Sequence, residues 1–320
     1  ILIMPLFLQL HQRFGFSNIK DPELRSIIGH SITRLPSTNG CNVVFISQEE
    51  YATAICQKFC EENSLGPPEK ALRPISTPVK QFPDAGDKQK AEREGEFGPE
   101  APKHVGRFLW LYRGTRGDVG VGTSRLQRRM TKWSVAEDDA VFRMYRYIWC
   151  TRSLGLLYAV DPSDLDSLKQ LLLFDADHAG DRETTAKSTT GFLLGMHSEK
   201  TWAVLSYGTK LQTSTARGTP EAEAVACADA TFGAAAPPPT FWKQVAMRDL
   251  PTVALVDNDA ARAAVKHGEP KRFSHIRKHQ DISMSALHEY YCADGNTLAR
   301  VASERNGSDF LTKPLDHTLH

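Results

Sequence analysis

The chain lacks an excess of either charge and contains little cysteine. Its 320 residues include 39 Lys and Arg against 38 Asp and Glu, so the formal net charge is +1. A near-neutral total neither requires nor excludes a nucleic-acid partner, because local basic patches matter more than the sum. The 6 cysteines are scattered, which favours reduced thiols over a disulfide scaffold. Cys56 and Cys60 have no second Cys or His pair with zinc-finger spacing after them, which disfavours a zinc site.

Long hydrophobic runs are also missing. No stretch approaches the ~18 consecutive apolar residues of a membrane helix, so we expect no membrane span. The opening segment ILIMPLFLQLHQRF is apolar, but it has neither the basic leading segment nor the small-residue cleavage site of a signal peptide. Because the sequence begins at Ile1 and resembles the interior of a protein, we expect it to be a fragment of a longer chain.

What remains is the composition of a globular protein, long enough for two domains. Residues 42–59 predict a strand followed by an amphipathic helix, and the polar, Pro- and Gly-interrupted residues 76–106 predict a long linker or surface loop. Residues 107–158 predict helices in which aromatic residues alternate with Arg, giving a basic face that is either solvated or in contact with nucleic acid. Turn residues around 159–167 mark a boundary, and we divide the chain into domains 1–165 and 166–320.

The second domain has the pattern of an α/β protein with a mixed sheet. An apolar run at 171–174 predicts a buried strand, and it leads directly into Asp175. Two β-rich segments, 188–196 and 201–212, predict antiparallel strands. A helix follows with Thr219 as its expected N-cap. The remaining predicted elements are a strand at 252–257, a helix closed by Gly268, a strand near 296–303 and a short helix capped by Ser308.

Four carboxylates lie where predicted strands end or helices begin. Asp175 and Asp257 end two strands, and Glu221 and Asp309 lie in the first turns of two helices. Functional residues concentrate at such positions. Two carboxylates ~4 Å apart repel by about 4 kcal/mol at an effective dielectric near 20. Divalent cations would compensate that repulsion, and Mg²⁺ or Mn²⁺ suits oxygen ligands.

Each of these carboxylates also has an ordinary explanation. An Asp after a strand is commonly a turn residue or a helix cap. Glu221 and Asp309 would each favour the dipole of the helix that they begin. Helical periodicity does not choose between Glu221 and Glu223, because every face of their helix is apolar or small.

The order and local context of the four carboxylates resemble the ribonuclease H domain of copia-type LTR-retrotransposon polyproteins. Five segments between residues 175 and 315 carry the resemblance, in the order DADHAGDRETTAKSTTGFLLG, STARGTPEAEAVA, VDNDAARAAV, HIRKHQDI and GSDFLTKPL. The upstream segments RPISTPV and 107–158 are similar to the end of that family's reverse transcriptase. The polymerase motif Tyr-x-Asp-Asp is absent from the sequence, so we do not expect this chain to synthesise DNA.

The resemblance implies a ribonuclease H-like mixed sheet flanked by helices. A mostly helical remnant of the reverse-transcriptase palm, thumb and connection would precede it. Two Mg²⁺ ions, or Mn²⁺, would bind there and support hydrolysis of the RNA strand of RNA–DNA hybrids. Asp177 and Glu223 would be neighbours in the motif rather than ligands. By position, the implied catalytic and metal-binding residues are Asp175, Glu221, Asp257 and Asp309.

The expected partners are an RNA–DNA hybrid and the upstream polymerase region of the same polyprotein, inside a cytoplasmic virus-like particle or the nucleus. His275 and His279 either assist proton transfer or product release, or are ordinary surface or packing residues. Basic residues would contact the hybrid backbone, although each is equally explained as a solvated surface charge. These residues are Lys210, Arg217, Lys271, Arg272, Arg277 and Lys278.

Two departures from the family pattern leave other functions open. His178 stands where the family has Trp, and three prolines in the segment 234–242 should break a helix that restarts near Thr240. A catalytically inactive remnant that still binds nucleic acid and a purely structural connection module are therefore the alternatives to an enzyme.

Overall fold

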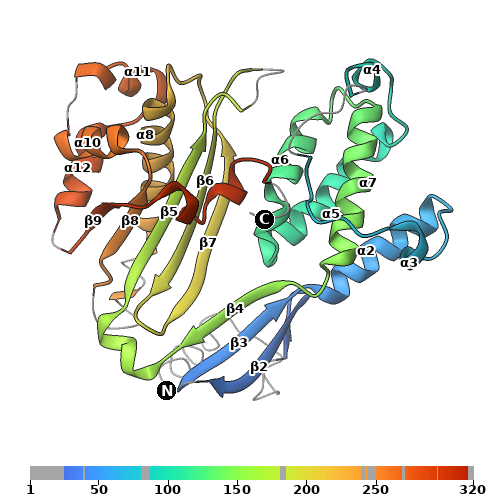
Figure 1. Cartoon of the computed structure of the whole chain (residues 1–320), viewed down its shortest axis with the longest axis horizontal. Helices are drawn as coiled ribbons and strands as arrows, with labels where there is room; N and C mark the ends of the chain where they lie inside the picture. Colours follow the sequence, from blue (N-terminus) through green and yellow to red (C-terminus); the bar gives the residue numbers. More distant parts are fainter. Residues whose placement is uncertain are drawn as a thin grey trace, which may run out of the picture.

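The structure is a computed structural model that describes residues 25–38, 40–80, 87–180, 185–238, 242–243, 249–268, 271–293 and 295–315. The protein is of the mixed α/β class. The described strands form one mixed sheet of nine strands in the order β1-β2-β3-β4-β7-β6-β5-β8-β9. Two groups of helices flank this sheet, one from each half of the sequence (Figure 1).

The first half of the chain forms one edge of the sheet and a helical layer. Its four strands pair antiparallel in chain order. They are β1 Ser26–Ile27, β2 His30–Thr38, β3 Cys41–Ser47 and β4 Gly155–Val160. The helices are α2 Glu49–Glu62, α3 Pro68–Ala71, α4 Asp87–Ala91, α5 Ala101–Gly114, α6 Gly120–Arg129 and α7 Val135–Cys150. Their apolar faces form a core around Phe59, Phe108 and Tyr145, with the predicted strand and helix of residues 42–59 in place.

The prediction of a long linker at 76–106 was wrong in part. Residues 87–91 are helical, and α5 begins at Ala101, which is fully buried in the core. Pro102 is compatible with this start because the first turn of a helix leaves its N–H groups without helical partners. The polar composition of the segment therefore concealed a helix start.

Arginine side chains of α7 hold the chain that precedes α4. Arg143 donates hydrogen bonds to the carbonyl and hydroxyl oxygens of Thr77, and Arg146 donates to the carbonyl of Arg73. These side chains therefore serve intramolecular contacts, which gives no support to the alternative that this face of α7 binds nucleic acid.

The second half of the chain forms the other five strands. An antiparallel meander of three strands is extended by two strands that run parallel to its first strand and to each other. The strands are β5 Lys169–Asp177, β6 Thr189–His197, β7 Trp202–Leu211, β8 Thr252–Val256 and β9 Thr297–Arg300. The main helices are α8 Thr219–Ala230, α10 Asp259–His267, α11 Ile276–Gln280 and α12 Met284–Cys292. Their core includes Leu172, Phe174 and Leu194.

Helix ends in this half follow the sequence closely, with small shifts. Gly218 rather than Thr219 is the N-cap of α8, which passes at its other end into the π-helix η4 Thr231–Ala235. Gly268 ends α10 with φ 83°, a conformation that glycine adopts without strain. The expected helix restart at Thr240 lies outside the described residues.

The two cores are separate but joined. One draws on residues 52–149 and the other on residues 172–298. β4 pairs with β7 only at Ala159 and Trp202. Tyr112 on α5 adds two hydrogen bonds to β7, because its carbonyl accepts from the Tyr207 hydroxyl and its hydroxyl accepts from the Thr209 N–H. The cores divide the chain where a domain boundary was predicted, although the division into domains stays a prediction.

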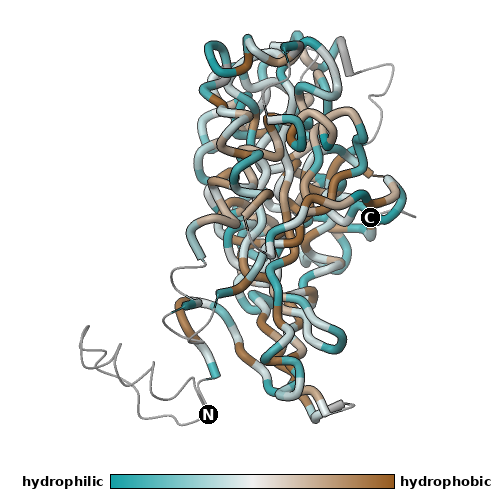
Figure 2. Tube along the Cα trace, turned by 90° about the vertical axis from the view of Figure 1, so that its left-hand side faces the viewer, coloured by the Kyte–Doolittle hydropathy of each residue, from teal (hydrophilic) through white to brown (hydrophobic). Residues whose placement is uncertain are grey.

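Hydrophobic and hydrophilic residues are interspersed along the described chain (Figure 2). Among the described helices, none has the length and apolar character needed to cross a membrane.

A candidate carboxylate centre at one edge of the sheet

Three carboxylates meet where β5 and β8 end. β5 and β8 are parallel neighbours, so their carboxyl ends lie at the same edge of the sheet. Asp175 lies near the end of β5, and Asp257 follows β8 directly. β7 runs in the same direction as β5, so α8, which follows it, starts at this edge and brings Glu223 there. One oxygen from each of these three carboxylates lies within 4.8 Å of the others.

Asp175 is inside its strand rather than after it, contrary to the sequence prediction. β5 continues to Asp177, and Asp175 pairs with Gly191 of β6. The Asp175 side chain is buried and accepts a hydrogen bond from the Thr312 hydroxyl. Burial raises the pKa of Asp175 to about 6, although the Thr312 bond and the nearby Lys313 charge oppose the shift.

Glu223 is the most strongly perturbed acid of the group. It is 3 % exposed. Burial and, after it, the charges of Asp175 and Asp257 raise the pKa of Glu223 to about 9. A backbone hydrogen bond from Ala176 opposes the shift, but Glu223 Oε2 is buried with no hydrogen-bond partner among the described residues. Without a cation, the three acids therefore cannot all be ionised at neutral pH.

Glu221 is not a member of this group. Its carboxylate oxygen Oε2 accepts from the backbone N–H of Arg217 at 3.1 Å and lies 3.0 Å from His275 Nε2. Residues two apart on a helix face different directions, so Glu221 and Glu223 cannot serve one site equally. The geometry groups Glu223 rather than Glu221 with Asp175 and Asp257, and the assignment of Glu221 from motif position stays a prediction.

Asp309 lies beside the cluster and is linked to it by a lysine. It opens the short 3₁₀ helix η7 Asp309–Leu311. Lys313 Nζ lies 2.9 Å from Asp309 Oδ2 and 3.9 Å from Asp175 Oδ2. Asp309 Oδ1 is buried without a partner in the described part of the chain. Asp309 therefore belongs to the same neighbourhood as Asp175, with the Lys313 charge between them.

Thr312 and Lys313 were not singled out from the sequence, although both stand in the segment GSDFLTKPL. Local pattern gave no reason to bring them to Asp175, because the contact joins residues 137 positions apart. The available signal was the motif itself, which contains Thr312 and Lys313 close after Asp309.

The basic residues expected to contact a hybrid are mostly exposed. Lys210 Nζ lies 2.8 Å from Asp229 Oδ1, so part of its charge is already neutralised. The side chain of Arg272 lies outside the described residues. Lys210 and four others are exposed, which fits both a surface charge and a backbone contact. The other four are Arg217, Lys271, Arg277 and Lys278.

The two histidines differ in their surroundings. His275 lies beside Glu221, whereas His279 is exposed and its carbonyl accepts a hydrogen bond from Ser214.

The donor set fits a hard divalent cation. Every clustered ligand atom is a carboxylate oxygen, and two buried carboxylate oxygens, on Glu223 and Asp309, lack hydrogen-bond partners in the described structure. Oxygen-only ligands suit Mg²⁺, Mn²⁺ or Ca²⁺, whereas zinc sites favour nitrogen and sulfur.

The buried thiol Cys56 donates to the carbonyl of Tyr145, so it offers no comparable site.

No known family model matches the chain, and a search of curated proteins found no match.

Proposed function

We propose that this chain is the ribonuclease H of a copia-type retrotransposon and hydrolyses the RNA strand of RNA–DNA hybrids. The observation that carries the proposal is the cluster of Asp175, Glu223 and Asp257, whose carboxylate oxygens meet at the edge of the sheet, with Asp175 and Glu223 buried and Asp257 partly buried. Acids whose pKa is strongly raised by burial and by neighbouring carboxylates are concentrated at functional sites.

The strand arrangement supports the proposal. A meander of three antiparallel strands, β5 to β7, is followed by α8 and then by β8, which lies parallel to β5 on its other side. The resemblance implies a ribonuclease H-like sheet with three early strands, a helix and a further strand, and this order agrees with it.

The residues at the site would divide the work. Asp175, Glu223 and Asp257 would hold Mg²⁺, with Asp309 as the fourth carboxylate. The metal would supply Lewis acidity for hydrolysis of the phosphodiester to 5′-phosphate and 3′-hydroxyl ends. Lys313 fixes the Asp309 carboxylate through its 2.9 Å contact.

Glu221 has a supporting role in this scheme. Its contacts with the Arg217 N–H and His275 fix the start of α8, two residues before Glu223.

Hybrid recognition would rely on shape and backbone charge. Contacts to 2′-hydroxyls distinguish RNA from DNA, and lysines and arginines at phosphates make binding salt-dependent. Exposed Arg217, Arg277 and Lys278 lie at or near the start of α8 and on α11, beside the carboxylate edge. The upstream polymerase region of the same polyprotein would hold the rest of the hybrid.

Cleavage of a labelled RNA–DNA hybrid tests the proposal. The protein is assayed with Mg²⁺, with EDTA, and as the variants Asp175→Asn and Asp259→Asn. Asp259 is exposed and pairs with Arg262, so its variant is the matched control. We expect cutting of the RNA strand that requires Mg²⁺, is lost in Asp175→Asn and survives in Asp259→Asn.

A second pair of variants separates the two glutamates. Glu223→Gln should abolish cleavage, whereas Glu221→Gln should leave most of it. The opposite order would restore the assignment made from motif position. A folded chain that binds the hybrid without cutting it would identify an inactive remnant, and one that does neither would identify a structural module.

A further inference from the structure

The C-terminal segment 309–315 lies between the two cores. On the sheet side, the Thr312 hydroxyl donates to Asp175 and the Thr209 hydroxyl donates to the Leu311 carbonyl. Gly191 of β6 makes this approach possible, because a Cβ there would lie 2.5 Å from Thr312 Cγ2. Figure 1 shows the segment, in red, crossing from the sheet towards the helices of the first half.

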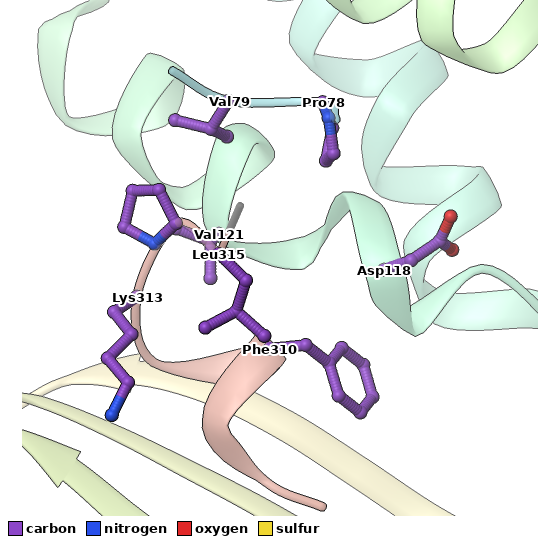
Figure 3. A pocket seen from close by; sticks show the side chains of 8 residues that line it. Pro78, Val79, Asp118, Val121, Phe310, Lys313 and Leu315 are labelled. Carbon is purple, nitrogen blue, oxygen red and sulfur yellow. The ribbon is translucent and has the colours of Figure 1, made fainter. Parts of the chain in front are cut away.

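On the other side, the segment docks on the helical part of the chain. Phe310 and Leu315 line one small cavity together with Pro78, Val79 and Val121 of the first half of the chain (Figure 3). The cavity volume is about 10 Å³, which is close to the minimum for one water molecule. In the same view Lys313 points away from the helices, towards the strands.

Gly117, which begins the turn before α6, belongs to the same interface. A Cβ there would lie 3.2 Å from the Tyr207 ring and 3.5 Å from the Phe310 ring. Gly117 therefore lies against both the Tyr207 ring of β7 and the Phe310 ring.

This segment has little intrinsic reason to keep its shape. Its only helix, η7, is a single 3₁₀ turn of three residues. Such turns form few hydrogen bonds and depend on tertiary packing. Each residue of the functional pair is followed closely by an apolar anchor: Phe310 comes directly after Asp309, and Leu315 comes two residues after Lys313.

We propose that the helical part of the chain completes the carboxylate centre. In this proposal Phe310 and Leu315 are positioning residues that fix Asp309 and Lys313 against Asp175 by docking on Pro78, Val79 and Val121. The role of Asp309 as a ligand rests on the proposed function, but the docking does not. A residue such as Val121 in α6 then controls a site to which it contributes no ligand.

The first readout is hydrogen exchange in the metal-free full chain. The backbone N–H groups of Leu311, Thr312 and Lys313 are bonded to Ser308 and Asp309, so they report the order of the segment. Phe310→Ala and Val121→Ala should accelerate their exchange at least tenfold, and Phe310→Leu should restore most of the protection.

Phe142→Ala is the matched control. Phe142 is also half-buried, and it packs in the helical core against Phe59 without lining the cavity at the segment. It should leave exchange in the segment unchanged.

The second readout is the Mg²⁺ concentration that gives half-maximal cleavage. Phe310→Ala and Val121→Ala should raise it by about tenfold or more, as seen when groups that orient metal ligands are lost, and Phe142→Ala should not. Unchanged exchange in both Phe310→Ala and Val121→Ala would overturn the proposal, whatever the activity. Accelerated exchange in a chain that never cleaves a hybrid would support the docking and refute the nuclease.

Discussion

Replacing Glu223 by Gln should stabilise the metal-free protein. The ordinary pKa of this acid is 4.5, whereas burial and the neighbouring carboxylates raise it to about 9 in the folded protein. Between these pH values the folded state keeps a proton that the unfolded state has lost, so stability falls as pH rises. One such group lowers the free energy of unfolding by about 1.4 kcal/mol per pH unit above its ordinary pKa. The loss is on the order of 3 kcal/mol at pH 7.

Urea denaturation in EDTA at pH 6, 7 and 8 measures this effect. The free energy of unfolding of Glu223→Gln should exceed that of the parent, by a margin that grows with pH. Glu221→Gln is the control two residues away. It should be less stable than the parent, because Glu221 accepts a hydrogen bond from Arg217 and contacts His275.

Magnesium should narrow this difference, because it stabilises the parent and so offsets most of the cost of the buried acid at pH 7. A ligand present at 100 times its dissociation constant stabilises the folded state by about 2.7 kcal/mol, and only the parent retains the full site. If metal-free Glu223→Gln were less stable than the parent at pH 8, or if the pH slopes of the two were equal, the inference that Glu223 is a buried acid repelled by Asp175 and Asp257 would be refuted.

Three further changes test other parts of the structure. Asp257→Asn should abolish hybrid cleavage and raise stability in EDTA, because one repelling charge is gone; lower stability would contradict the clustering. Gly191→Ala should raise the Mg²⁺ midpoint of cleavage several-fold, because the new Cβ would overlap Thr312 at 2.5 Å. Burial alone would raise the pKa of Glu62, but hydrogen bonds, led by that of Arg107, lower it to about 2. The Glu62–Arg107 pair should stabilise the fold above pH 4.5, and this stabilisation should be lost as pH falls towards 2. Unfolding followed by circular dichroism should show a smaller loss of stability over this pH range in Arg107→Met than in the parent.

Elements with strong local signals were predictable from the sequence. The apolar run before Asp257 predicted β8. Helix α10 begins after Asn258 and ends at Gly268, because a side-chain N-cap and a residue with positive φ are requirements that a short stretch of sequence meets by itself. The strands predicted at 188–196 and 201–212 followed from similar signals and are confirmed as β6 and β7.

The choice between Glu221 and Glu223 was not a local matter. Every face of α8 is apolar or small, so the rotation of the helix is set by its packing on the sheet. Lys313 was hidden for the same reason, since its place at Asp175 depends on a segment distant in the chain.

The position of the 309–315 segment has a consequence for the order of folding. Its contacts reach back to Asp175, 137 residues earlier, and to Gly117, earlier still. The β5–β7 meander, in contrast, closes contacts between near neighbours in sequence. Contacts of large sequence separation form late, because the entropy of loop closure must be overcome first. A ribosome would also release this segment after everything that it touches. The segment that brings Asp309 and Lys313 to Asp175 is therefore expected to dock late, after the strand that carries Asp175 has formed.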